Sequence, residues 1–204
     1  MTPALPPIEL LATALALLYV VLAARGSAWC WPPAFASSCL MAYRVFAAYD
    51  LYFDAALNAF YAAMAVVGLW RWTRGTPNAG EAPPITAMSW REHAAWIGGG
   101  AIVVAVGAGL AEAYTAAARP LADATTTVYS VIGTILLVER RLDNWLYFAA
   151  MDAVYVWLYH ERGSALFAGL FAVYTVLAVI GYASWRRSMT AELNPNPAQA
   201  DPLE

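Results

Sequence analysis

Asp152 places a carboxylate in the middle of an apolar stretch that runs from Trp145 to Tyr159. Steps of three and four residues from Asp152, which follow one face of an α-helix, reach aromatic side chains in both directions. These side chains are Trp145, Phe148, Tyr155 and Tyr159. Aromatic faces stack on flat ligands and attract cations, while a carboxylate pairs with a cation or accepts ligand hydroxyls. The face therefore predicts a binding site for a flat, positively charged molecule.

Asn58 is a second polar residue inside an apolar segment, one helical step before Tyr61. An amide in such a segment either contacts a ligand or joins two helices by hydrogen bonds. A structural role stays open for Asp152 too, as an acceptor for a hydroxyl of a neighbouring helix. The expected lining of one substrate site is Asn58, Tyr61, Trp145, Phe148, Asp152, Tyr155 and Tyr159.

Enzyme chemistry finds little support in the sequence, and we expect no catalytic residues, metal or cofactor. His93 and His160 lie near expected helix ends, and no HExxH, GxSxG or phosphate-binding glycine loop occurs. Cys30 and Cys39 have the spacing of buried membrane thiols rather than of a disulfide or metal site. The absence of Lys excludes a retinal Schiff base. No nucleic-acid partner is expected, and homo-oligomer formation stays open.

The composition indicates that a lipid bilayer surrounds these residues. The chain of 204 residues is 62% apolar and only 12% charged, with nine Trp and a mean hydropathy of +0.55, far from ordinary globular usage. Its apolar runs have the length that crosses a hydrocarbon core of about 30 Å, so we expect seven transmembrane helices and an all-α integral membrane protein. The runs cover residues 8–24, 32–49, 51–72, 94–111, 121–138, 145–159 and 164–185.

The sixth run places Asp152 at depth. Asp152 follows Asp143 by nine residues, or about 13 Å of helix, so it lies near the bilayer centre. A carboxylate there costs about 2.5–3.5 kcal/mol on insertion scales, and therefore must face the protein interior.

The basic residues predict the orientation. All eleven are Arg, and the seven-helix arrangement puts eight on one side of the membrane and three on the other: Arg44, Arg119 and Arg162. By the positive-inside rule, the N-terminus is outside and the C-terminus is cytoplasmic. The first apolar run has no basic stretch before it, so we expect it to be retained as a helix rather than cleaved as a signal.

An internal repeat divides the chain into two halves. The segment LNAFYAAMAVVGLWRW at residues 57–72 matches LFAVYTVLAVIGYASW at residues 170–185, pairing Tyr61 with Tyr174, Gly68 with Gly181 and Trp72 with Trp185. Upstream, a weaker match with an offset of 114 residues pairs Trp31 with Trp145. Because a three-helix unit repeated directly would be inverted, one connector helix restores the orientation and gives two parallel bundles.

This arrangement sets the expected domain boundaries. Residues 8–72 form the first three-helix bundle, 73–118 the loop and connector helix, 119–187 the second bundle, and 188–204 a disordered cytoplasmic tail. In repeat transporters of this kind, the substrate site lies between the repeats near the midplane. Gly68 and Gly181 are expected close-contact positions between helices. Together with the Pro32–Pro33 pair, they are also expected flex points.

The second half resembles the PnuC family of vitamin transporters. The resemblance rests on Glu139–Arg141, Asn144–Trp145, Leu158–Tyr159, Gly163 and the closing Gly-x-x-x-Trp-Arg at residues 181–186. In the first half it rests on WCWP at residues 29–32, LYFDAALNAFY and GLWRW, so it covers about residues 8–187. The resemblance implies a three-plus-one-plus-three helix fold related to the SWEET sugar transporters.

The resemblance also implies facilitated uptake of nicotinamide riboside, a precursor for NAD biosynthesis, across a bacterial inner membrane. Phosphorylation inside the cell then traps the vitamin, so no ion coupling is required. Nicotinamide riboside members carry Trp-Asn-x-x-Asn where this chain has Phe148 to Asp152, and thiamine branches favour an acid at the last position. Asn58 also stands where Gln is expected. The substrate thus stays open between nicotinamide riboside, thiamine and a related vitamin, with a non-transporting receptor or assembly subunit as the other class.

Overall fold

The computed structural model describes residues 7–49, 52–74, 83–115, 119–161 and 163–193. Over these residues the chain is helical, with seven α-helices and one short 3-10 helix, η1. The α-helices are α1 (Pro7–Ala24), α2 (Trp31–Tyr49), α3 (Tyr52–Arg74), α4 (Trp90–Tyr114), α5 (Pro120–Val138), α6 (Asn144–Glu161) and α7 (Ala165–Leu193), and η1 (Ala28–Cys30) lies between α1 and α2.

The apolar runs predict these helices closely, with two differences at the polar ends. Helix α4 begins before its apolar run because Ser89 and Glu92 form a reciprocal capping box, which satisfies backbone donors of the first turn. Helix α7 continues to Leu193, so the expected tail boundary at residue 188 falls inside a helix. The expected break at Asp50, Arg162, part of the 73–89 loop and the tail from residue 194 lie outside the described residues.

Four of the described helices are long and apolar enough to cross a membrane by length and composition alone, namely α1, α4, α5 and α7. The other three carry polar side chains within their apolar sequence, such as Ser37 on α2, Asn58 on α3 and Asp152 on α6.

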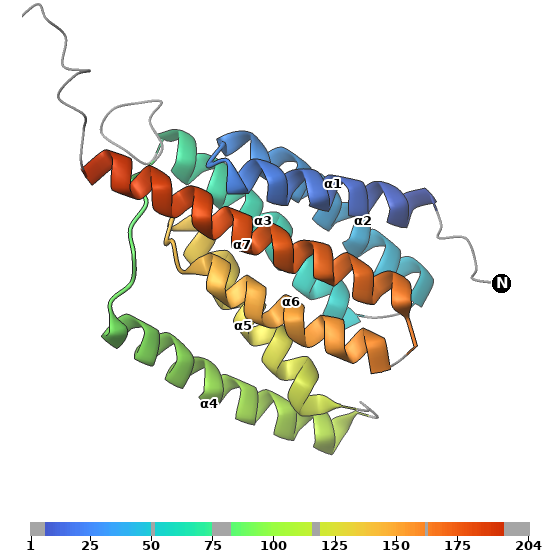
Figure 1. The fold of residues 1–204 in the computed structure, drawn as a ribbon. Helices are drawn as coiled ribbons and strands as arrows, with labels where there is room; N and C mark the ends of the chain where they lie inside the picture. Colours follow the sequence, from blue (N-terminus) through green and yellow to red (C-terminus); the bar gives the residue numbers. More distant parts are fainter. Residues whose placement is uncertain (1–6, 50–51, 75–82, 116–118, 162, 194–204) are drawn as a thin grey trace, which may run out of the picture.

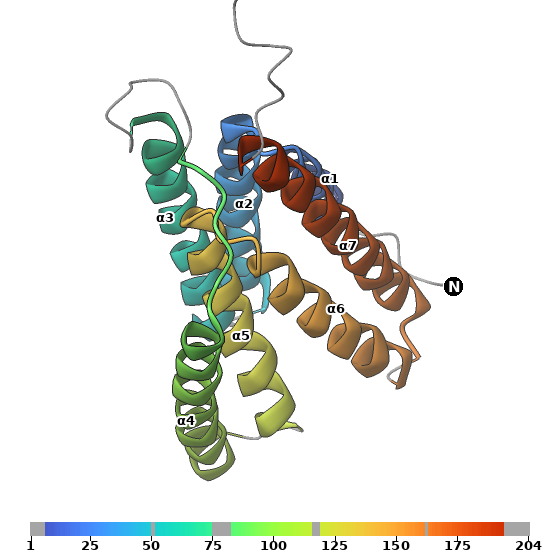
Figure 2. The ribbon, with the colours of Figure 1, turned by 60° about the vertical axis from the view of Figure 1, so that its left-hand side comes forward.

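Six helices form a closed ring. Each helix of the series α1, α2, α3, α5, α6 and α7 packs against the next, and α7 packs against α1. Figures 1 and 2 show the ring from two directions, with α4 outside it against α5. Helices α1, α3, α5 and α7 finish at the same end of the ring, which we call the Trp185 end (Figure 1).

Polar contacts attach α4 to the ring at the Trp185 end. The imidazole of His93 lies 3.3 Å from both the Tyr147 hydroxyl and a carboxylate oxygen of Asp143. The other oxygen of Asp143 accepts a hydrogen bond from the backbone N–H of Met88 at 2.6 Å. Glu92 and Arg141 form an ion pair at 2.8 Å. The start of α4 is thereby fixed to the turn between α5 and α6.

Candidate functional site

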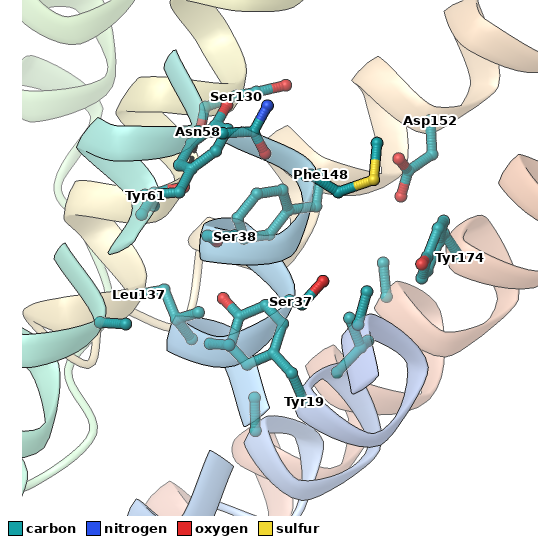
Figure 3. A pocket seen from close by; sticks show the side chains of 18 of the residues that line it. Tyr19, Ser37, Ser38, Asn58, Tyr61, Ser130, Leu137, Phe148, Asp152 and Tyr174 are labelled. Atoms are coloured by element: carbon teal, nitrogen blue, oxygen red, sulfur yellow. Dashed lines mark hydrogen bonds between the residues drawn. The ribbon is translucent and has the colours of Figure 1, made fainter. Parts of the chain in front are cut away.

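A cavity of about 410 Å³ lies at the centre of the ring, and residues of all six ring helices line it. This volume is within the range of small-molecule sites. Its walls are mainly aromatic and aliphatic, with a small set of polar side chains (Figure 3). The polar lining residues are Tyr19, Ser37, Ser38, Asn58, Tyr61, Ser130, Thr134, Asp152, Tyr155 and Tyr174.

Asp152 supplies the carboxylate among the described lining residues, and no Arg or His lines the cavity with it. Its half-buried side chain lies beside Phe148 and Tyr174 (Figure 3). No hydrogen bond or ion pair holds the Asp152 carboxylate within the described part of the chain. A cation or hydroxyl donor in the cavity would therefore meet an acid whose charge no protein cation neutralises.

Six of the seven residues expected from the sequence line this cavity: Asn58, Tyr61, Trp145, Phe148, Asp152 and Tyr155. Tyr159 does not line it. The Tyr159 ring stacks on Phe171 with centroids 5.4 Å apart and on Phe167 at 5.2 Å. Phe171 does line the cavity and also stacks on Tyr155 at 4.5 Å, so Tyr159 supports one of its aromatic walls from behind.

The structure adds lining residues that helical stepping missed. Trp31 and Tyr174 line the cavity, as do their repeat partners Trp145 and Tyr61. Applying the repeat to the candidate list would have identified both. Phe171, the repeat partner of Asn58, also lines the cavity and would have been found in the same way. Tyr19 lines it too, and no sequence signal that we used points to Tyr19.

Several hydroxyls on α2 and α5 donate hydrogen bonds to backbone carbonyls. Thr125, Thr126 and Thr134 each donate to a carbonyl four residues earlier on α5, as expected for Thr inside a helix. Ser37 donates to the Ala12 carbonyl at 2.8 Å and thereby joins α2 to α1. The amide of Asn58 donates to the Asp54 carbonyl at 2.9 Å.

Four buried tryptophans, Trp31, Trp72, Trp145 and Trp185, form a layer toward the Trp185 end that we call the tryptophan floor. Trp31 and Trp145 line the cavity. Their rings make edge contacts with Trp72 at 5.2 Å and with Trp185 at 5.6 Å, respectively. Trp72 and Trp185 lie 5.8 Å apart and join the two sides.

Two glycines make room for the inner pair of rings. A Cβ atom on Gly68 would lie 2.4 Å from the ring of Trp31, and one on Gly181 would lie 2.7 Å from the ring of Trp145. Both distances are far below van der Waals contact, so only glycine allows the rings to approach so closely.

The outer pair of rings is hydrogen-bonded across the ring of helices. Trp72 on α3 donates its indole N–H to the Val138 carbonyl at the end of α5, at 3.1 Å. Trp185 on α7 donates to the Ala23 carbonyl near the end of α1, at 2.9 Å. The two bonds thus tie α3 to α5 and α7 to α1.

Arg140 covers the outer pair from the turn between α5 and α6. Its guanidinium carbon lies 4.8 Å from the ring centroid of Trp72 and 5.5 Å from that of Trp185. The residue is 7% exposed and has a positive φ of 54°. Burial lowers the pKa of Arg140, and the carboxylate of Glu192 opposes that shift. Sequence reasoning used Arg140 for orientation and as part of the Glu139–Arg141 turn of the family resemblance, and missed this contact.

No group of three or more His, Cys, Asp or Glu residues that could hold a metal ion occurs in the described ranges. The groups that line the cavity are rings, hydroxyls, an amide and one carboxylate.

Comparisons with known proteins connect the chain to one family. The sequence model of the family described as nicotinamide mononucleotide transporter matches residues 6–187. The riboflavin/roseoflavin transporter RibM of Streptomyces davaonensis is 26% identical over 196 residues, covering 93% of this chain and 91% of RibM. The crystal structure of the vitamin B3 transporter PnuC superposes with a TM-score of 0.71 at 20% identity, covering 90% of this chain and 82% of that one.

These relatives are transporters and not enzymes, and they disfavour a receptor or assembly subunit. The family match covers α4, nearly all of the six ring helices and every residue that lines the cavity. The chain therefore belongs to the nicotinamide mononucleotide transporter family, the PnuC family of membrane vitamin transporters.

Proposed function

We propose that this chain carries nicotinamide riboside into the cell by facilitated diffusion across the inner membrane. The carrying observation is the Asp152 carboxylate, which faces a ring-lined cavity without a protein cation. Nicotinamide riboside combines a flat pyridinium cation with ribose hydroxyls. Phe148 and Trp145 offer faces to the pyridinium, while Asn58 and Tyr61 offer polar groups to the ribose.

The orientation follows from the charges at the helix ends. With eight Arg on one side and three on the other, the C-terminus and the Trp185 end are cytoplasmic. A cytoplasmic phosphorylation of the vitamin would then keep its free concentration low inside. The gradient alone would drive uptake, and no coupled ion would be needed.

The two halves would work as parallel three-helix bundles that rock about the cavity, with α4 as the connector. The contacts support this arrangement because each has a counterpart in the other half. Helix α3 packs on α5 as α7 packs on α1. Gly68 receives the ring of Trp31 as Gly181 receives that of Trp145.

Riboflavin is the second candidate, because the relative RibM is named as a riboflavin and roseoflavin transporter. The riboflavin ring system is neutral and larger, so it would depend on stacking and hydroxyl contacts more than on Asp152. Thiamine is cationic like nicotinamide riboside, so the charge of Asp152 does not distinguish between these two vitamins.

Calorimetric titration of the purified protein with the three vitamins tests the proposal. We expect micromolar or tighter binding of nicotinamide riboside, and counterflow of the same vitamin in proteoliposomes without an ion gradient. If riboflavin or thiamine alone bound, that vitamin would replace nicotinamide riboside as the proposed substrate. Binding of none of the three would reject the proposal.

A further inference from the structure

The tryptophan floor closes the cavity toward the Trp185 end, and its outer pair carries the contact between the two halves of the chain. Trp72 belongs to the first half and Trp185 to the second, and their rings lie 5.8 Å apart. Each also donates a hydrogen bond to a carbonyl of the opposite half. For a ligand to leave the cavity at this end, these contacts must break.

Buried polar atoms without a hydrogen-bond partner are concentrated in and beside this floor. In the described ranges these atoms are Nε1 of Trp31, Nε1 of Trp145, Nε and Nη1 of Arg140, and Oδ1 of Asn144. Native structures leave few such atoms unpaired, because each costs free energy that water would return. The unpaired atoms therefore raise the free energy of the closed tryptophan floor, and contact with water on opening would lower it.

Arg140 connects the two halves in the closed layer, but two of its own donors are buried there without a partner. Its guanidinium stacks on Trp72 and Trp185, so it bridges the two halves. Its unpaired donors would gain water when the halves separate. The repeat places Gly26 at the equivalent turn of the first half, also with a positive φ, of 70°. The second half thus has a charged side chain where the first has none.

We propose that Trp72, Trp185 and Arg140 form the gate between the cavity and the Trp185 end, and that the unpaired guanidinium of Arg140 makes the closed gate easy to open. This inference rests on the proposed function, since a gate serves a transporter that exposes its site to each side in turn. Arg140 does not line the cavity. It is a positioning residue that acts through the two tryptophans.

Cys30 provides a native reporter of gate opening. Its side chain is fully buried and packs in the same apolar cluster as the four tryptophans. In a Cys39→Ser background, Cys30 is the remaining thiol. The rate at which a small, membrane-permeable maleimide alkylates Cys30 in proteoliposomes then measures how often the floor opens.

Two variants in this background should shift the rate in opposite directions. Arg140→Met keeps an unbranched side chain on the rings but removes the unpaired donors, so we expect alkylation and vitamin counterflow to slow by about fivefold or more. Trp72→Phe keeps a ring but removes the donor to the Val138 carbonyl, so we expect alkylation to speed up by about fivefold.

Arg25→Met is the matched control, because Arg25 is an exposed arginine at the first-half turn, and it should leave the rate unchanged. General destabilisation would speed alkylation in both floor variants, so a common direction, or no change in either, would overturn the gate. Calorimetry on the parent protein tests the proposed function independently of the gate. Absence of vitamin binding rejects that function, whereas the alkylation rates without ligand decide the gate alone.

Discussion

Burying the Asp152 carboxylate in the membrane costs free energy, and the proposed binding of a ligand would offset that cost. A carboxylate on an apolar helix at this depth is unfavourable unless it faces a partner or a polar cavity. In this chain it faces the cavity, and the described structure gives it no protein partner. The side chain therefore either binds a ligand or carries a cost without compensation.

Asp152→Asn keeps the size of the side chain and removes its charge. We expect it to weaken nicotinamide riboside by about 1–3 kcal/mol, because it replaces a charge-assisted contact with a neutral one. Calorimetry on the variant gives the change directly. Asp123→Asn is the matched control, since Asp123 carries the same group but does not line the cavity. Equal affinities of Asp152→Asn and the parent would place Asp152 outside the binding contacts.

Steps of three and four residues from Asp152 along α6 predict one wall of the cavity but not how far that wall extends. Of the face from Trp145 to Tyr159, the residues Trp145, Phe148, Asp152 and Tyr155 line the cavity. The face spans about 21 Å along α6, and Tyr159 instead stacks behind the wall on Phe171. Where the cavity ends depends on the packing of α7 against α6, which the sequence of α6 alone does not contain.

At the scale of elements, the close approach of helices within each half depends on one glycine. Gly68 lets α3 accept the ring of Trp31 from α2, and Gly181 lets α7 accept the ring of Trp145 from α6. The sequence predicts both glycines as close-contact positions between helices and as candidate flex points. The structure shows them as close-contact positions, while flexing remains a prediction.

Gly181→Ala and Gly68→Ala should each destabilise the protein by about 1–3 kcal/mol, because the added methyl group overlaps a tryptophan ring in a packed layer. The midpoint of thermal unfolding in detergent measures the effect. Gly169→Ala on the same helix, α7, meets no atom within 4 Å, so it should leave the midpoint unchanged or raise it slightly. A fall as large for Gly169→Ala as for Gly181→Ala would contradict the packing explanation.

The ends of elements show why part of the site could not be predicted. Apolar length places seven helices well because the bilayer requires it. The role of Arg140 depends on a left-handed residue in the α5–α6 turn and on rings from both halves. Neither feature has a local signal at Arg140, so the sequence suggested a charge at a membrane surface and a turn typical of the family, but no contact with the tryptophans.

At the scale of the whole molecule, different side chains surround the two ends of the cavity. The floor at the Trp185 end contains rings from both halves and a buried guanidinium. The opposite end has the stacked rings of Tyr155, Tyr159 and Phe171. The two halves carry different residues at matched positions, such as Asn58 against Phe171 and Gly26 against Arg140.

The proposed orientation makes a prediction for the intact cell. Tyr114, at the end of α4, is 82% exposed, and Ser188 is exposed on the last turns of α7, at the Trp185 end. In the Cys39→Ser background, an impermeant maleimide added to whole cells should label Tyr114→Cys and leave Ser188→Cys unlabelled until the membrane is permeabilised. The eight-to-three distribution of Arg requires this result, because the arginine-rich side stays in the cytoplasm. The reverse pattern would invert the transporter and turn the tryptophan floor into an outer gate, while equal labelling of both sites would mean that they do not lie on opposite sides of the membrane.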